Sequence, residues 1–234
     1  MKTIGVIGGI GPESTVDYYR AIIAAYRERQ PDGSYPSIII NSIDLKKMIE
    51  LVGGNKLDQV TDYLVCEVER LVGAGADVAL LAANTPHLVF DEVQSRSPLP
   101  LVSIVQATCE AARALGLKRP GLFGTRFTMQ GRFYPDAFSK AGIELVVPDD
   151  TERAYIHDKY MGELVKGIFP AETREHLMAI IERMKTRDGI DAVILGGTEL
   201  PLILRDTTAS GIPLLDTTQI HAKAIVDRAW RVES

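Results

Sequence analysis

Apolar runs of strand length alternate along the chain with longer segments in which apolar residues recur every three or four positions. The runs are almost continuously apolar, as is typical of parallel strands that helices cover on both faces. The pattern therefore predicts an α/β fold. Strands are expected in the segments TIGVIG, PSIIINSI, DVALLAA, PLVSIV, PGLFGT, IELVVP, DAVILGG and IPLLDTT.

The segment after the first strand is predicted to be a helix with one apolar face. Pro12 and Glu13 suit its first turn, because proline lacks an amide that would be unpaired there and an acid lies at the positive end of the helix dipole. The face expected to pack on the sheet contains the apolar residues Val16, Tyr19, Ile22, Ile23 and Tyr26.

Comparing the sequence with itself reveals a repeat. Three pairs of segments match in the same order and at nearly the same spacing, and that shared spacing separates a duplication from the ordinary likeness of buried strands. The pairs are GADVALLAANTPH from Gly75 with GIDAVILGGTELP from Gly189, PLVSIV from Pro100 with PLLDTT from Pro213, and GVIGG from Gly5 with GLFGT from Gly121.

The repeat predicts two pseudo-symmetric α/β domains with parallel sheets, related by internal duplication. We expect the first domain to comprise residues 1–97 plus 212–234 and the second residues 98–211. Ligands of open parallel sheets bind beyond the carboxyl ends of the strands. A site between the domains is therefore expected, with AANTPH and GGTEL facing each other across it.

Composition narrows the class of partner. The chain has 234 residues, 46% hydrophobic and 24% charged, with a net charge of -5 and no long basic run, which argues against nucleic acid and membrane surfaces as partners. The N-terminus runs into a glycine turn rather than a signal-type cleavage site, no segment has transmembrane length, and there are two cysteines. We expect a cytoplasmic protein that binds a small molecule.

The turn GGIGPES after the first strand is a candidate binding loop. Gly9 and Gly11 would let the backbone approach a ligand, and the N-terminus of the following helix offers amides to an anion. The spacing of a dinucleotide-binding loop fails at Ser14. Carboxylate binding and a tight turn without a ligand both fit these residues.

The strand end AANTPH carries polar side chains directly after a buried run. Asn84 and Thr85 offer donors and acceptors that suit a carboxylate or an ammonium group, and His87 has a side chain that ordinarily titrates near neutral pH. The same residues fit a plainer role, in which Asn84 and Thr85 cap the next helix and His87 lies in its first turn.

The strand end GGTEL offers similar groups. Gly197 leaves backbone amides accessible, Thr198 supplies a hydroxyl, and Glu199 suits a substrate ammonium, although a glycine turn before a helix has the same residues. In FGTRFTM, the hydroxyls of Thr125 and Thr128 lie beside turn amides, where threonines also serve as helix caps.

The segment HDKYMGELVKG contains candidates for the counter-charge of a substrate carboxylate. Lys159 and Lys166 carry the charge, and His157 and Tyr160 lie beside them in the sequence. Most lysines lie on solvated faces, so the residues alone do not choose among them.

Together these motifs resemble the aspartate/glutamate racemase superfamily over nearly the whole chain. The resemblance rests on GGIGPEST, ANTPH, GTRFTM, YMGELVKG and GGTELPLI. It implies a cofactor-independent isomerase, without pyridoxal phosphate or metal, that moves the α-proton of an acidic amino acid between two faces and forms a homodimer. The substrate-binding positions that it implies are Asn84, Thr85, Thr125, Lys166 and Thr198, to which the turns add Gly9, Gly11 and Thr128.

Two positions depart from the family pattern. The family's strand ends read C-N-T and G-C-T-E, and their cysteines are the opposed acid and base, but here Ala83 and Gly197 occupy those positions. Two-base racemisation needs one deprotonated and one protonated group on opposite faces of the α-carbon. A methyl group and a hydrogen provide neither, and we expect their small size to leave extra space at the strand ends.

Neither remaining cysteine is expected to replace the missing thiols. The helix before DVALLAA has an apolar face from which Cys66 points away, and Cys109 lies in the helix after PLVSIV, beyond the strand end. His87 and Glu199 are the candidate substitutes for acid or base. The apolar face of the helix that carries Cys66 contains Val60, Leu64, Val68, Leu71 and Val72.

Three functions fit the sequence. The leading one is racemase or isomerase chemistry on a small amino acid or carboxylate, with turnover in question because both thiols are absent. The second is a binding protein that keeps the ligand contacts and catalyses nothing. The third is a lyase or decarboxylase that uses His87, Glu199 or a lysine.

Overall fold

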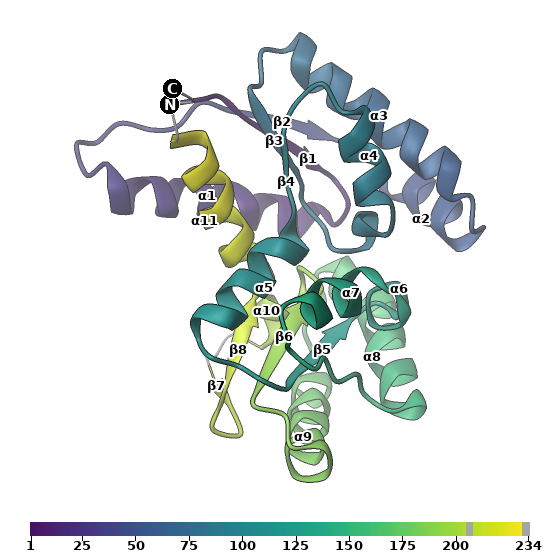
Figure 1. The fold of residues 1–234 in the computed structure, drawn as a ribbon. Coiled ribbons are helices and arrows are strands. Elements are labelled where there is room, and N and C mark those ends of the chain that lie inside the picture. The colour runs from purple at the N-terminus through teal and green to yellow at the C-terminus, as the bar shows by residue number, and fades with distance from the viewer. Residues whose placement is uncertain (205–207, 231–234) are drawn as a thin grey trace. The chain divides into compact units, whose positions relative to one another are not determined.

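The protein, described by a computed structural model over residues 1–204 and 208–230, consists of two compact α/β units (Figure 1). The first unit contains Met1–Ile104 and the segment from Thr218 onward, and the second contains Val105–Thr217. Each unit has its own four-stranded sheet. The predicted α/β class with two domains is confirmed.

The sheet of the first unit has the strand order β2-β1-β3-β4, with every pair parallel. Its elements are β1 (Ile4–Gly8), α1 (Pro12–Arg29), β2 (Ile38–Ser42), α2 (Leu45–Gly53), α3 (Leu57–Gly73), β3 (Val78–Leu81), the 3-10 helix η1 (Thr85–Val89), α4 (Phe90–Arg96), β4 (Leu101–Val102) and the closing helix α11 (Thr217–Trp230).

Helices cover both faces of this sheet, α1 and α11 on one and α3 and α4 on the other (Figure 1). Ile4, Val6 and Leu80 point toward the first pair and pack with Ile22 of α1 and Ile225 of α11. The alternation of side chains along β1 and β3 gives each face its own apolar layer. A parallel sheet buried in this way needs the nearly continuous apolar strands that the sequence shows.

The sheet of the second unit has the order β5-β6-β8-β7, in which only β7 runs antiparallel to its neighbour. Its elements are α5 (Ile104–Ala114), which begins at the unit boundary, β5 (Pro120–Gly124), α6 (Arg126–Gln130), α7 (Phe133–Lys140), α8 (Asp150–Gly162), the 3-10 helix η2 (Leu164–Lys166), α9 (Ala171–Asp188), β6 (Ala192–Gly196), α10 (Leu200–Ile203), β7 (Thr208–Ala209) and β8 (Ile212–Asp216).

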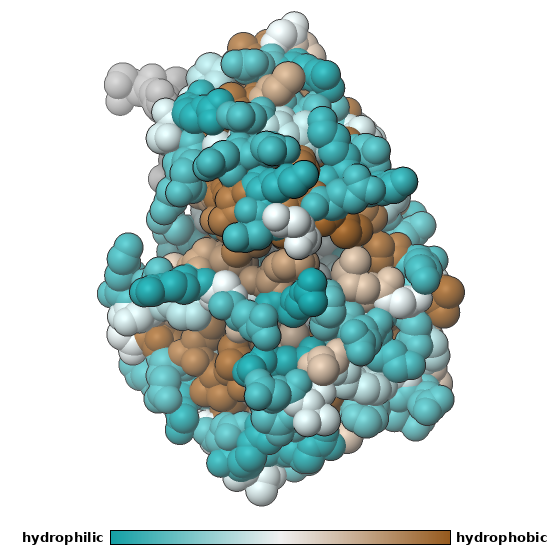
Figure 2. Space-filling view, turned by 90° about the vertical axis from the view of Figure 1, so that its right-hand side faces the viewer, coloured by the Kyte–Doolittle hydropathy of each residue, from teal (hydrophilic) through white to brown (hydrophobic). Residues whose placement is uncertain are grey.

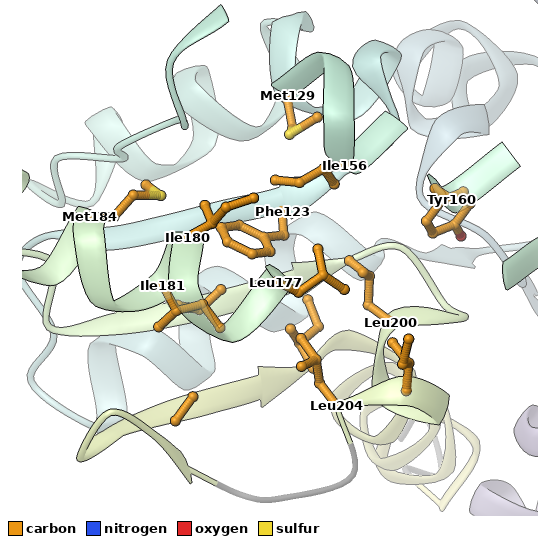
Figure 3. Packing of buried hydrophobic residues seen from close by; sticks show 14 of the residues in the cluster. Phe123, Met129, Ile156, Tyr160, Leu177, Ile180, Ile181, Met184, Leu200 and Leu204 are labelled. Carbon is orange, nitrogen blue, oxygen red and sulfur yellow. The ribbon is translucent and has the colours of Figure 1, made fainter. Parts of the chain in front are cut away.

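One face of this sheet packs against α8 and α9 (Figure 3). Phe123 of β5 lies against Leu177 and Ile180 of α9, and Tyr160 of α8 lies at the opposite end of the view from Met184. Burial of large apolar side chains is worth about 1.5–3 kcal/mol each, so this layer holds α8 firmly on the sheet.

The two sheets share one register, which supports the duplication. Gly5 pairs with Ala79 in the first unit, and the repeat-equivalent Gly121 pairs with Val193 in the second. The next strands also correspond, because Leu80 pairs with Val102 as Ile194 pairs with Leu215.

The unit boundaries differ from the predicted domains of residues 1–97 plus 212–234 and 98–211. β4 pairs with β3 and so belongs to the first sheet, and β8 pairs with β6 and belongs to the second. The chain therefore crosses between units at the first residues of α5 and α11. Residues 205–207 and 231–234, which the predicted domains include, lie outside the described residues.

The buried face of α1 differs from the predicted one. Ile22 and Tyr26 are buried as expected, but Val16 and Tyr19 are 47% and 46% exposed. The core side of the first turns is formed by Ser14, Thr15 and Tyr18. Thr15 lies so close to Gly8 that a Cβ added at Gly8 would be 2.4 Å from Thr15 Cγ2, so a small side chain fits at this point of α1. On α3, Val72 is likewise exposed.

The segment IELVVP, predicted to be a strand, forms only an isolated bridge. Val146 makes a single parallel bridge to Gly121, on the edge of β5 that corresponds to the β2 side of β1.

Over the described residues, no helix combines the length and apolarity needed to cross a bilayer. Hydrophilic residues cover most of the face drawn in Figure 2, with apolar residues showing between them.

Candidate functional site

The glycine turn after β1 is held together by its own hydroxyls. Gly9 has φ +79° and donates its N–H to Thr15 Oγ1 at 2.9 Å, and a Cβ at Gly9 would lie 2.3 Å from the carbonyl oxygen of Ile43. Gly11 has φ +107°, and its carbonyl accepts hydrogen bonds from Ser14 Oγ at 2.7 Å and Thr15 Oγ1 at 3.1 Å. The glycines are thus required by the turn itself, and ligand binding by Gly9 and Gly11 stays a prediction.

Asn84 lies at the end of β3, where the N-cap of η1 is found. Its side chain is buried but makes no cap hydrogen bond, while its carbonyl accepts the N–H of His87 at 3.0 Å. Thr85 is the first residue of η1 and is partly exposed. Side-chain capping by Asn84 is therefore not what places this residue at the strand end.

His87 is bound on both sides by the backbone around the β3 end. Its Nε2 accepts the N–H of Ile104 at 3.1 Å, so Nδ1 carries the proton and donates to the carbonyl of Ala83 at 3.1 Å. The ring stacks on Phe90 with 4.8 Å between centroids. Burial, reinforced by the nearby His221, lowers the pKa of His87 to about 3. The histidine is a neutral link between β3 and α5.

Thr125 and Thr128 shape the turn after β5. Thr125 is the N-cap of α6, and its Oγ1 accepts the N–H of Thr128 at 3.3 Å. Thr128 is fully buried against Gly124, where an added Cβ would lie 2.9 Å from Thr128 Cβ. Both threonines have structural roles in this turn, and their ligand contacts stay a prediction.

The space beside Gly197 is filled, contrary to the expectation of extra room. A Cβ added at Gly197 would lie 2.4 Å from Cε2, 2.9 Å from Cζ and 3.0 Å from the hydroxyl oxygen of Tyr160. Tyr160 comes from α8, a different element, and is 6% exposed. A side chain at position 197 and the ring of Tyr160 therefore exclude each other in this arrangement.

Tyr160 brings an ionisable pair to the end of β6. Its hydroxyl donates a hydrogen bond to Glu199 Oε2, and Thr198 Oγ1 donates to the same oxygen at 3.0 Å. Glu199 is 1% exposed. Burial, together with the negative charge of Glu199, raises the pKa of Tyr160 well above its ordinary value, so the phenol stays protonated.

Tyr160 belongs to the candidate segment HDKYMGELVKG, but nothing in the sequence marks it as a site residue. Its partner, Glu199, is far away in the chain, and no spacing rule joins a residue of α8 to the end of β6. The only signal was indirect, since a glycine at a position where the family has a side chain leaves a volume that some other residue has to fill.

The basic candidates lie on the surface of the second unit. Lys166 is the last residue of η2 and is exposed. Lys159 pairs with Glu163, and His157 Nδ1 accepts the N–H of Arg126 at 3.2 Å. Within residues 1–204 and 208–230, no three His, Cys, Asp or Glu side chains gather as a metal site.

The cysteines occupy helices, not strand ends. Cys66 is exposed on α3, and Cys109 is buried in α5 with its Sγ 3.7 Å from the carbonyl of Ala137. Burial raises the pKa of the Cys109 thiol, which keeps it protonated.

The chain is similar to proteins of one family along nearly its whole length. The profile of the Asp/Glu/Hydantoin racemase family matches residues 7–225. A broad specificity amino-acid racemase, RacX, from Bacillus subtilis is 24% identical over 232 residues, which cover 95% of this chain and 96% of RacX.

Solved structures show the same similarity. The crystal structure of a putative Asp/Glu racemase from Yersinia pestis is 34% identical, with a TM-score of 0.88 over 99% of this chain and 100% of that one. An aspartate racemase homologue from Pyrococcus horikoshii is 36% identical, with a TM-score of 0.83 over 99% of this chain and 100% of that one.

Proposed function

Because the chain belongs to the Asp/Glu/Hydantoin racemase family, we propose that it binds a small amino acid or carboxylate at the carboxyl ends of its parallel strands, without a cofactor. Asn84 and Thr85 after β3, Thr125 after β5, Thr198 after β6 and the exposed Lys166 are the groups proposed to hold it. Backbone amides at the strand ends and a lysine charge suit a carboxylate.

One observation separates this protein from a thiol-dependent racemase. Ala83 has no ionisable group, and at position 197 the volume of a side chain is filled by the ring of Tyr160. The protein is therefore proposed to bind the family's class of ligand without interconverting its enantiomers by two thiols.

In the lyase or decarboxylase alternative, His87 is poorly suited to act as the acid or base. Both ring nitrogens of His87 are occupied by backbone hydrogen bonds, and its depressed pKa keeps it neutral. Glu199, with Tyr160, remains the acid-base candidate for any proton transfer.

We also propose a homodimer, which sedimentation equilibrium tests directly.

Calorimetric titration with L-aspartate, D-aspartate, L-glutamate and D-glutamate tests ligand binding. At least one of the four should bind, and Lys166→Ala should weaken that binding about tenfold, equivalent to about 1.4 kcal/mol. Lys159→Ala is the matched control, because Lys159 pairs with Glu163 and should change the affinity little.

Chiral chromatography of the bound enantiomer after prolonged incubation tests the absence of racemisation. No second enantiomer should form. The binding proposal fails if none of the four ligands binds, and rapid interconversion would show that acid and base groups other than thiols act on both faces.

A further inference from the structure

The place of the missing thiol at position 197 is occupied by a hydroxyl group from helix α8. Apart from the chain neighbours of Gly197, the three atoms nearest to an added Cβ all belong to Tyr160, and one of them is its hydroxyl oxygen at 3.0 Å. A cysteine sulfur lies one bond beyond Cβ. The phenolic oxygen of Tyr160 is thus a proton-carrying atom in the region that a cysteine side chain at 197 would enter.

This hydroxyl is coupled to a carboxylate in a dry environment. The Tyr160 hydroxyl donates a hydrogen bond to Glu199, and Thr198 Oγ1 donates one to the same carboxylate oxygen at 3.0 Å. All three side chains are buried. A phenol that donates its hydrogen to a carboxylate still has oxygen lone pairs with which to accept another proton. Exclusion of water strengthens such charge-assisted hydrogen bonds.

We propose that Tyr160 and Glu199 form a proton-transfer pair that acts on one face of the α-carbon of a bound amino acid. The inference rests on the proposed ligand class and specifies what the β6 end does to that ligand. Tyr160 is the proposed catalytic residue, and Glu199 acts through it as a positioning residue and proton acceptor.

The proton-transfer step balances without another reactant. The Cα–H bond breaks and its electron pair moves toward the substrate carboxylate, while the α-proton goes to the Tyr160 oxygen. At the same time the phenolic proton of Tyr160 goes to Glu199, which becomes neutral as the substrate gains one negative charge. The reverse transfer restores the Cα–H bond, with solvent hydrogen if Glu199 has exchanged its proton meanwhile.

Action from one face predicts exchange without inversion. The other position at which the family pattern has a cysteine is Ala83, and its methyl group cannot supply a proton. The carbanion is therefore reprotonated by the group that deprotonated it, and the configuration is retained. This outcome differs from that of a two-base racemase, in which exchange and inversion occur together.

The test follows by NMR, in deuterated buffer, the α-hydrogen of whichever of the four amino acids binds to the chain. The signal should disappear while chiral chromatography shows that the configuration of that amino acid persists. Tyr160→Phe, which keeps the ring, should slow the exchange by about 10²–10⁴-fold, the range typical of lost general acid-base catalysis. Glu199→Gln should slow exchange similarly, because the amide cannot accept the phenolic proton.

Tyr155→Phe is the matched control. Tyr155 lies on the same helix, stacked on His176 with 3.9 Å between ring centroids, and its hydroxyl has no place in the proposed pair. This variant should exchange the α-hydrogen at the rate of the unmodified protein. Far-ultraviolet circular dichroism of each variant verifies that it is folded.

Calorimetry with the four amino acids separates the two proposals. Failure of the unmodified protein to bind any of the four overturns the proposed function. Binding without α-hydrogen exchange, exchange that Tyr160→Phe leaves unchanged, or formation of the opposite enantiomer overturns the one-face mechanism alone.

Discussion

The ends of β3 and β6 occupy equivalent places in two sheets of the same register, yet they carry different chemistry. At the β3 end, both ring nitrogens of His87 are bonded to the backbone, and burial lowers the pKa of this histidine to about 3. At the β6 end, Tyr160 and Glu199 form a buried hydrogen-bonded pair. The backbone register is alike at the two strand ends while the side chains differ, so the fold fixes where a site lies but not what it does.

The largest expected effect on stability comes from removing the buried side chain of Tyr160 at the β6 end. Tyr160→Ala removes a buried ring and a donor to Glu199, so the free energy of unfolding should fall by about 3–5 kcal/mol, as for other large-to-small aromatic changes in cores. Urea denaturation measures it. Tyr155→Ala on the same helix should cost clearly less, and an equal loss would mean that the β6 end is not tightly packed.

Placing a cysteine at the β6 end should produce a clash with Tyr160. Gly197→Cys should lower the free energy of unfolding by about 1–3 kcal/mol, because its Cβ would lie 2.4 Å from the ring. Combined with Tyr160→Ala, the cysteine should fill part of the cavity and recover stability. A double-mutant cycle by urea denaturation should then show coupling of about 0.5–3 kcal/mol, and strict additivity would contradict the assigned contact.

The buried histidines near the β3 end should make the free energy of unfolding depend on pH. Burial lowers the pKa of His87 to about 3 and that of His221 to about 4, from an ordinary 6.5, so the unfolded chain binds protons that the folded chain does not. This stability is complete above pH 6.5 and is lost as the pH falls toward 4, by up to about 1.4 kcal/mol per pH unit for each histidine.

His87→Gln tests the assignment of this pH dependence. The variant should flatten the dependence of the unfolding free energy between pH 6.5 and 4, measured by urea denaturation at each pH. His176→Gln, the same substitution at an exposed position, is the control for the exchange of side chains itself. An identical slope in the His87 variant would show that His87 is already protonated in the folded protein near pH 5.

The smallest effect concerns the turns after β1 and β5. Thr125→Ala removes the side-chain cap of α6 and should cost about 0.5–2 kcal/mol in thermal or urea unfolding, whereas Thr125→Ser should retain most of the stability. The turn after β1 has Gly11 at the helix N-cap and no side-chain cap to lose. Equal stability of both Thr125 variants would show that the cap contributes little.

The sequence alone determined the alternating elements, the internal repeat and the absence of thiols at both strand ends. These features follow from local rules: continuous apolar strands, helical periodicity and glycines where the backbone turns sharply. The buried face of α1 was not predictable in this way. Ser14 and Thr15 are polar by composition but face the core, because the turn uses their hydroxyls and their small size permits close packing on β1.

Only the tertiary structure decided what replaces the missing thiols. Asn84, Thr198 and Glu199 were recognisable because they directly follow apolar strands. Tyr160 was not, since the hydrogen bond that gives it significance joins α8 to the end of β6, between residues 39 positions apart in the chain. Such contacts arise from packing several elements on one sheet, and packing fills any volume that a glycine leaves.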